Sequence, residues 1–159
     1  MKCRELEKEQ IFKTLRDRVS LVIGNNLRRD EKLKAICKLL KKHVSYYSFV
    51  GFYIVDNSQN LLVLGPFEGK PTEHIKIPFG VGICGQAAMQ KKTFVVQNVA
   101  EESNYLSCNA DVKSEIVIPI FKENEIVGEL DIDSNTLSPF TYGDKIFLES
   151  ISQEVATLF

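Results

Sequence analysis

Two cysteines lie where a thiol can do chemistry, Cys84 and Cys108, and they are 24 residues apart. Cys84 lies in the glycine-rich run 80–85, where the pattern predicts the start of a short helix. The positive end of a helix dipole lowers the pKa of a nearby thiol, so we expect Cys84 to ionise near neutral pH. Cys108 lies in a long polar stretch, residues 97–114, and we expect it to be exposed. Two loop thiols without a metal fit a redox pair, and they fit two unrelated thiols equally well.

The other two cysteines have simpler interpretations. Cys37 lies on an apolar helical stripe and is expected to be a small core residue. Cys3 is close to the start of the chain and is expected to be inert. Zinc would need further ligands beyond the two loop thiols, and the sequence offers His43 and His74 alone, so we expect no metal site.

Three carboxylates alternate along one predicted strand, at Glu129, Asp131 and Asp133. Residues two apart in a strand point to one face, so the three share a side, and Glu115 on the neighbouring strand can join them. One interpretation is an ordinary solvated sheet face. The other is a cluster that binds an ammonium group, or that holds one carboxyl protonated because crowded carboxylates raise each other's pKa.

The run Gly80-Val-Gly-Ile-Cys-Gly85 formally matches a dinucleotide-binding fingerprint. That motif requires a parallel strand-helix-strand unit, whereas the flanking strands here are predicted to form hairpins, so we do not expect a nucleotide site. Glycines that open a short helix still expose backbone N–H groups, which can bind a carboxylate or phosphate.

Helices are predicted at both ends of the chain and strands between them. Apolar residues at helical spacing indicate helices over 6–23, 30–44 and 141–158, with Thr141 and Asp144 forming a capping box at the start of the last one. Hairpins are predicted at 48–64 and 115–132, single strands at 75–77 and 93–96, and a short helix at 83–89. This order favours an α+β fold, an antiparallel sheet covered by helices, as a single domain over 1–159.

Composition excludes several classes of protein. The chain has 159 residues and a net charge of −1, which excludes a globally basic nucleic-acid binder. No apolar run approaches the roughly 18 residues that a membrane span needs. Residues 1–46 carry a net charge of +7 and residues 47–159 a net charge of −8. Acidic residues are interleaved among the bases, which favours solvated helix faces over a nucleic-acid or membrane surface. The charged start of the chain indicates no leader peptide, so we expect a cytoplasmic protein.

Several segments together resemble the free methionine-(R)-sulfoxide reductases, which are single GAF-domain proteins. The resemblance extends from Gly51 to the C-terminal helix. It rests on Gly51-Phe-Tyr, Leu62-Val-Leu-Gly-Pro-Phe-Glu-Gly-Lys70, Ile77-Pro-Phe-Gly-Val-Gly-Ile-Cys-Gly85, Ser114-Glu-Ile-Val117 and Gly128-Glu-Leu-Asp-Ile-Asp-Ser134. It implies a six-stranded antiparallel GAF sheet flanked by helices, with the N- and C-terminal helices packed together, and a pocket closed by the long loop.

The resemblance also implies an activity and a set of site residues. Free L-methionine-(R)-sulfoxide would be reduced to methionine by a thiol-dependent enzyme without a cofactor, which is a homodimer, acts against oxidative stress and uses thioredoxin as reductant. By position, Cys108 matches the catalytic cysteine, and Cys84 matches a second cysteine that would close a disulfide with it. By position, Glu115, Asp131 and Asp133 match carboxylates that hold the substrate, and either Glu115 or Asp133 could donate the proton. The chemistry of such a substrate adds Phe49 and Tyr53 for its S-methyl end, and the backbone N–H groups around Gly82 and Ile83 for its carboxylate.

Two positions depart from the family pattern. His74 stands where the family often has a third cysteine, which leaves Cys84 or an external thiol to resolve the intermediate. Phe49 stands where the family often has tryptophan. The alternative from another class is a non-enzymatic GAF sensor of a small molecule or redox signal, since fold alone does not decide function. A module that binds a partner through its basic helices would leave the loop cysteines and the carboxylate strand unexplained.

Overall fold

The computed structural model describes residues 2–159, with side chains from residue 4 on, so the expectation for the Cys3 thiol lies outside it. The chain forms an α+β fold. It begins with α1 (Lys2–Ile23), α2 (Arg29–His43), β1 (Phe49–Asp56), β2 (Leu61–Glu68) and β3 (Lys76–Pro78). It continues with α3 (Gly82–Gln90), β4 (Phe94–Val96), a 3-10 turn (Val99–Glu101), β5 (Ser114–Lys122), β6 (Glu125–Ser134), α4 (Tyr142–Val155) and a second 3-10 turn (Ala156–Leu158). No helix in this described range is long and apolar enough to cross a bilayer.

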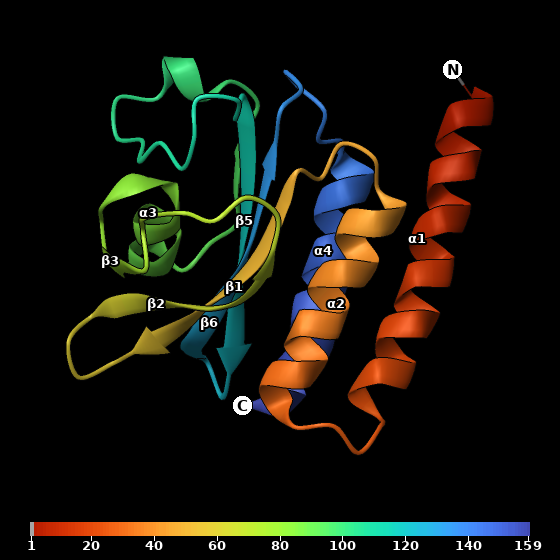
Figure 1. Ribbon diagram of the computed structural model, residues 1–159, viewed down its shortest axis with the longest axis horizontal. Coiled ribbons are helices and arrows are strands. Elements are labelled where there is room, and N and C mark those ends of the chain that lie inside the picture. Colours follow the sequence, from red (N-terminus) through yellow and green to blue (C-terminus); the bar gives the residue numbers. More distant parts are fainter. Residues whose placement is uncertain (1) are drawn as a thin grey trace.

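A six-stranded sheet in the order β3-β2-β1-β6-β5-β4 forms the centre of the molecule. Every paired neighbour is antiparallel, as the predicted hairpins require. Helices α1, α2 and α4 lie on one side of this sheet, and α3 with the long loop lies on the other (Figure 1). Two apolar clusters follow from this arrangement, a larger one between the sheet and the three helices and a smaller one around α3.

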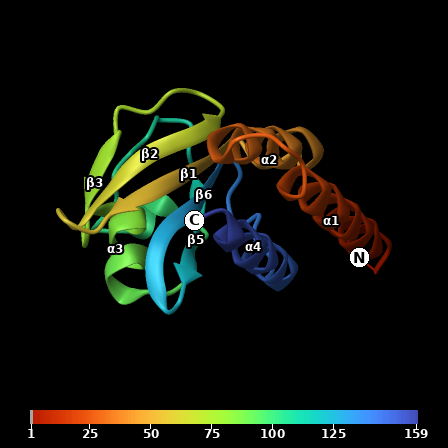
Figure 2. The same cartoon turned by 90° about the horizontal axis from the view of Figure 1, so that it is seen from below.

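The three-helix side is closed by packing between the two ends of the chain. Phe12 of α1 stacks on Phe147 of α4 with ring centroids 4.2 Å apart. Asp144, fully buried in the first turn of α4, accepts hydrogen bonds from the Tyr46 and Tyr47 hydroxyls and pairs with Lys8 of α1. Figure 2 shows α1 as the outermost helix of this layer. The expected packing of the N- and C-terminal helices is therefore confirmed.

The helix boundaries follow the predicted signals. Thr141 and Asp144 make the expected reciprocal capping box, which fixes where α4 begins. The apolar stripe of α2, which includes Cys37, is buried, so the interpretation of Cys37 as a core residue is confirmed. These elements hold β1, β5 and β6 in place, and the opposite face of those strands carries the polar residues described next.

Candidate active site

Four carboxylates are buried together on the α3 side of the sheet. Glu129, Asp131 and Asp133 of β6 are at most 1% exposed, and Glu115 of β5 is 4% exposed. Glu115 and Asp133 are direct cross-strand partners, which places their side chains on one face. Leu130, between the acids, points into the three-helix core. The interpretation as a solvated sheet face is therefore wrong, because the carboxylates are almost completely shielded from water.

Burial sets the protonation of this cluster. Loss of hydration raises the pKa of Glu115, Glu129 and Asp133 well above the ordinary value, and the neighbouring Asp131 adds to the effect. Burial also raises the pKa of Asp131 itself, to about 7, although hydrogen bonds from Glu115 and Cys84 oppose it. Both carboxylate oxygens of Glu129 and Asp133 lack a hydrogen-bond partner. Carboxyls with raised pKa values and free acceptor oxygens can hold a proton, or they can ionise when a cation binds beside them.

Helix α3 brings Cys84 against the carboxylates. Its first residue, Gly82, has φ +66°, and a Cβ on Gly85 would lie 2.5 Å from the Pro78 carbonyl, so glycine permits this close turn. The Cys84 side chain is buried, and its thiol donates a hydrogen bond to Glu115 Oε1 over 3.6 Å. The expectation of a lowered thiol pKa is wrong: burial raises the pKa of Cys84, and the nearby Asp131 adds to this, which outweighs the helix dipole.

Cys108 approaches the same place from the long loop. It is half-buried rather than exposed, so the expectation of a fully exposed thiol is wrong. Burial raises the pKa of the Cys108 thiol, the nearby Asp133 and Asp131 add to this, and a hydrogen bond with the Thr72 side chain opposes it. Cys84 and Cys108 line one pocket, together with Tyr53, His74, Ile77, Val81, Gly82, Ile83, Leu106, Glu115 and Asp131.

That pocket is closed. Its free volume is about 10 Å³, which is at the limit for a single water molecule. Leu106 of the loop lies over the start of α3, 3.0 Å from where a Cβ on Gly82 would be. The Asn104 side chain accepts a hydrogen bond from the Gly82 N–H and donates one to the Gly80 carbonyl, each of 2.8 Å. The Gly82 N–H, which we expected to be free to bind an anion, is therefore already bonded to the Asn104 side chain.

The structure brings together most of the site residues named from the sequence, with two exceptions. Asp133 lies beside the pocket as the partner of Glu115 but does not form its wall. Phe49 stacks on Phe67 at 5.5 Å and borders a different surface cavity, so it does not line the closed pocket. Four loop residues at this site were not predicted to have a role there, because none lies on a periodic pattern. His74 and Leu106 line the pocket, Asn104 bonds to the turn before α3, and Thr72 affects the pKa of Cys108.

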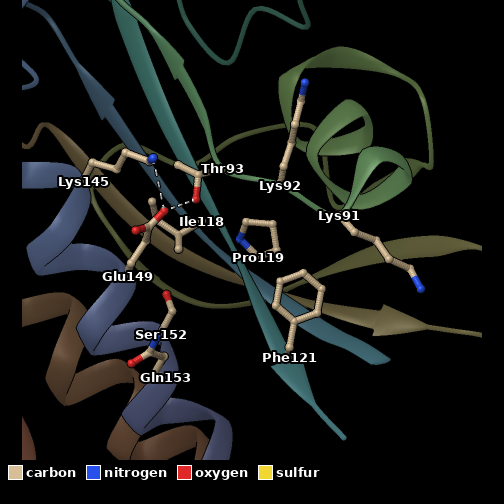
Figure 3. A pocket seen from close by; sticks show the side chains of 10 residues that line it. All are labelled: Lys91, Lys92, Thr93, Ile118, Pro119, Phe121, Lys145, Glu149, Ser152 and Gln153. Atoms are coloured by element: carbon tan, nitrogen blue, oxygen red, sulfur yellow. Dashed lines mark hydrogen bonds and ion pairs between the residues drawn. The ribbon is translucent and has the colours of Figure 1, made fainter. Parts of the chain in front are cut away.

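A metal site within this pocket and a second cavity elsewhere have less support. Ligand atoms of Cys84, Glu115 and Asp131 lie within 4.8 Å of one another and could hold a metal ion, but three ligands fall short of the four that structural zinc takes. A larger cavity, of about 490 Å³, lies between α4, the end of α3 and β5 (Figure 3). No cysteine lines it, and its one carboxylate, Glu149, already bonds to Thr93 and Lys145.

Comparison with known proteins places this site in a family. A family model described as GAF domain matches residues 26–159, so the chain belongs to the GAF domain family. GAF domain-containing protein A of Dictyostelium discoideum is 35% identical over 144 residues, which is 91% of this chain and 89% of that protein.

Among GAF domain proteins, the chain is similar to a group of named reductases. Free methionine-R-sulfoxide reductase of Escherichia coli is 36% identical over 120 residues, 76% of this chain and 69% of that protein. The free methionine-R-sulfoxide reductase of Neisseria meningitidis, solved in complex with its substrate, matches with a TM-score of 0.91 at 31% identity, covering 96% of this chain and 90% of that one. The chain belongs to the free methionine-R-sulfoxide reductases, a family of oxidoreductases.

Proposed function

We propose that this protein reduces free L-methionine-(R)-sulfoxide to methionine, with Cys108 as the nucleophile and Cys84 as the resolving thiol. The observation that carries the proposal is the convergence of two thiols and a buried carboxylate cluster on one small pocket. Membership in the reductase family supports the substrate, and the geometry supports the assignment of roles.

The substrate has three polar groups, and the pocket offers a partner for each. Its ammonium group would bind Asp131, Asp133 and Glu115, and it would supply a donor to the Asp131 and Asp133 oxygens that have no hydrogen-bond partner. Its carboxylate would bind the N–H groups of Gly82 and Ile83 once Asn104 has moved away. Tyr53, which lines the pocket, would contact the S-methyl end, with Phe49 drawn in from its stack on Phe67.

The first chemical step transfers the sulfoxide oxygen. The Cys108 thiolate attacks the substrate sulfur and forms an S–S bond with it. As the oxygen passes from the substrate sulfur to Cys108, this S–S bond and the substrate S–O bond both break, and the oxygen becomes the hydroxyl of a sulfenic acid on Cys108. A protonated carboxyl supplies the proton that this hydroxyl needs, and Glu115 is our candidate because burial raises its pKa. The substrate sulfur gains two electrons and leaves as methionine, and the Cys108 sulfur loses two.

The second step returns the enzyme to its reduced form. The Cys84 thiol attacks the Cys108 sulfenic acid, an S–S bond forms, and water leaves. The dithiol of thioredoxin then reduces this disulfide by thiol exchange and becomes oxidised itself. His74 contributes no thiol, so Cys84 is the cysteine of this pocket that remains to resolve the intermediate.

The buried acids also account for selectivity. A methionine sulfoxide inside a peptide has no free ammonium group, so it cannot neutralise the carboxylate cluster and would leave it uncompensated. We propose further that residues 1–159 form one GAF domain and that the protein works as a homodimer in the cytoplasm, in defence against oxidative stress, as the family resemblance implies. Light scattering coupled to gel filtration tests the dimer.

A turnover assay tests the function. Separated R and S sulfoxides of free methionine are incubated with the protein, thioredoxin, thioredoxin reductase and NADPH, and NADPH consumption is followed. We expect turnover of the R isomer alone, and none with an acetylated, amidated sulfoxide. Binding of the R isomer without turnover would instead support the GAF sensor and overturn the enzyme proposal.

A further inference from the structure

The segment between β2 and β3 lies directly against the part of the long loop that carries Cys108. The His74 ring nitrogen Nε2 is 3.0 Å from the Ser107 carbonyl oxygen. The Thr72 side chain lies near enough to Cys108 to oppose, through a hydrogen bond, the rise in the pKa of its thiol. Thr72 and His74 are half-buried, whereas Glu73 between them is exposed. Alternate residues of this segment therefore face the catalytic loop.

The Thr72 hydroxyl is oriented by its own chain. The His74 backbone N–H donates a hydrogen bond to Thr72 Oγ1 over 3.1 Å. Because that bond occupies a lone pair of the oxygen, the hydroxyl hydrogen is left free to point at the Cys108 sulfur. A hydroxyl that donates to a thiolate stabilises the charged form, and this is the effect that opposes the burial of Cys108.

His74 is itself held from the sheet. The Tyr53 hydroxyl of β1 donates to the His74 carbonyl over 2.9 Å, so the histidine backbone is tied to a buried strand residue. Its ring then reaches the Ser107 carbonyl, and that bond requires the proton on Nε2, because a carbonyl can only accept. The chain of contacts Tyr53–His74–Ser107 links the rigid sheet to the peptide immediately before Cys108.

A third contact between the same segments adds little. Lys70 and Asp111 form an ion pair of 2.6 Å, but their side chains are 69% and 57% exposed. Exposed pairs of this kind contribute roughly 0–1 kcal/mol. The positioning of Cys108 therefore rests on Thr72 and His74, which are both half-buried residues.

We propose that Thr72 and His74 are positioning residues for Cys108: the Thr72 hydroxyl stabilises the thiolate, and the His74 ring fixes the adjacent peptide so that the thiol stays beside the carboxylates. This inference deepens the proposed function and rests on Cys108 as its nucleophile. His74, at the position where the family often has a third cysteine, would thus act through a hydrogen bond rather than through a thiol.

The test for Thr72 measures the thiol without substrate. Cys108 is alkylated with iodoacetamide across a series of pH values, and its labelling rate is followed by peptide mass spectrometry. A hydrogen bond to a charged group is worth roughly one pKa unit or more, so Thr72→Val should raise the labelling midpoint by about one unit. Thr72→Ser should restore it, and the matched control Glu73→Gln, at the exposed neighbouring position, should not move it. A Thr72→Val midpoint equal to that of the unaltered protein would overturn this role.

The test for His74 separates positioning from folding. His74→Gln keeps an N–H donor, whereas His74→Phe removes it. We expect about tenfold faster amide hydrogen exchange at residues 107–109 in His74→Phe, near-normal exchange in His74→Gln, and unchanged exchange in β6 in both variants. In turnover, Thr72→Val and His74→Phe should lower kcat about tenfold and leave KM within about twofold. Equal loop exchange in both His74 variants would refute the positioning role. If the midpoint shifts but no variant turns over sulfoxide, the proposed function fails and this inference stands.

Discussion

Cys84 Sγ donates a hydrogen bond to Glu115 Oε1 across 3.6 Å, in a part of the site that water does not reach. A buried thiol that donates to a carboxylate is held in its protonated form, because ionisation would place two negative charges side by side. Cys108 is less buried and has the Thr72 hydroxyl as a stabilising partner. The two thiols therefore differ in environment, which is consistent with the different steps that we propose for them.

Single-turnover chemistry should separate these steps. We expect Cys84→Ser to release about one equivalent of methionine per chain and then stop, because the sulfenic acid on Cys108 has no partner. Cys108→Ser should release none. Rapid-quench chromatography measures the methionine, and dimedone labelling locates the sulfenic acid. Sustained thioredoxin-supported turnover in Cys84→Ser would show that another thiol resolves the intermediate, and any burst in Cys108→Ser would contradict the nucleophile assignment.

The closed pocket predicts a gating role for Asn104. Its two 2.8 Å hydrogen bonds hold the loop to the turn before α3. Two such bonds contribute on the order of 1–3 kcal/mol, so Asn104→Ala should speed labelling of buried Cys84 by roughly tenfold or more. The control is Ser103→Ala, at the exposed neighbouring position. Equal labelling rates for these two variants would mean that the pocket opens by another route.

The raised pKa of Asp131 predicts how stability depends on pH. In the unfolded chain this carboxyl ionises near its ordinary value of 3.8, and in the folded chain near 7. Between these values the folded chain binds more protons, so its stability falls as pH rises. The shift corresponds to at most about 4 kcal/mol across that window. Asp131→Asn should remove this contribution and therefore stabilise the protein more at pH 8 than at pH 5.

Thermal unfolding at these two pH values measures the effect. A suitable comparison is Asp111→Asn, because Asp111 is exposed and its pKa is lowered by Lys70 rather than raised. This control should not gain stability between pH 5 and pH 8. An equal gain for Asp131→Asn at both pH values would show that Asp131 is not strained by burial.

The contacts of Asp144 predict that the attachment of α1 to α4 contributes strongly to thermal stability. Its carboxylate satisfies two tyrosine hydroxyls, caps α4 and pairs with Lys8, all without exposure to solvent. Removing one partner of such a buried group costs about 3–5 kcal/mol. We expect Asp144→Ala to lower the thermal midpoint by about 10 °C. Asp17→Ala, on the exposed face of α1, should change it little, and comparable losses in both variants would contradict this anchoring.

The parts of this protein that local pattern determines were predictable. Period-two alternation placed Glu129, Asp131 and Asp133 on one face, and the Thr141–Asp144 capping box located the start of α4. Both signals are carried by residues a few positions apart, so they need no knowledge of the tertiary fold.

The predictions that were wrong concern residues whose neighbours come from distant parts of the sequence and meet them only after folding. The thiol pKa of Cys84 was assigned from its helix, but the carboxylates that raise it come from β5 and β6. Asn104 occupies the Gly82 N–H from 22 residues away in a loop without periodicity. Phe49 lies on the expected strand, yet its ring stacks on Phe67, a choice that depends on β2.

The alternation of acids with apolar residues along β6 has one more consequence. Leu130 and Ile132 fill the three-helix core, while their neighbours Asp131 and Asp133 face α3. A slip of one residue between β6 and its partners would exchange the two faces and drive the acids into hydrocarbon. The residues proposed to bind substrate therefore also specify the register of β6, because a sheet paired one residue out of register would be far less stable.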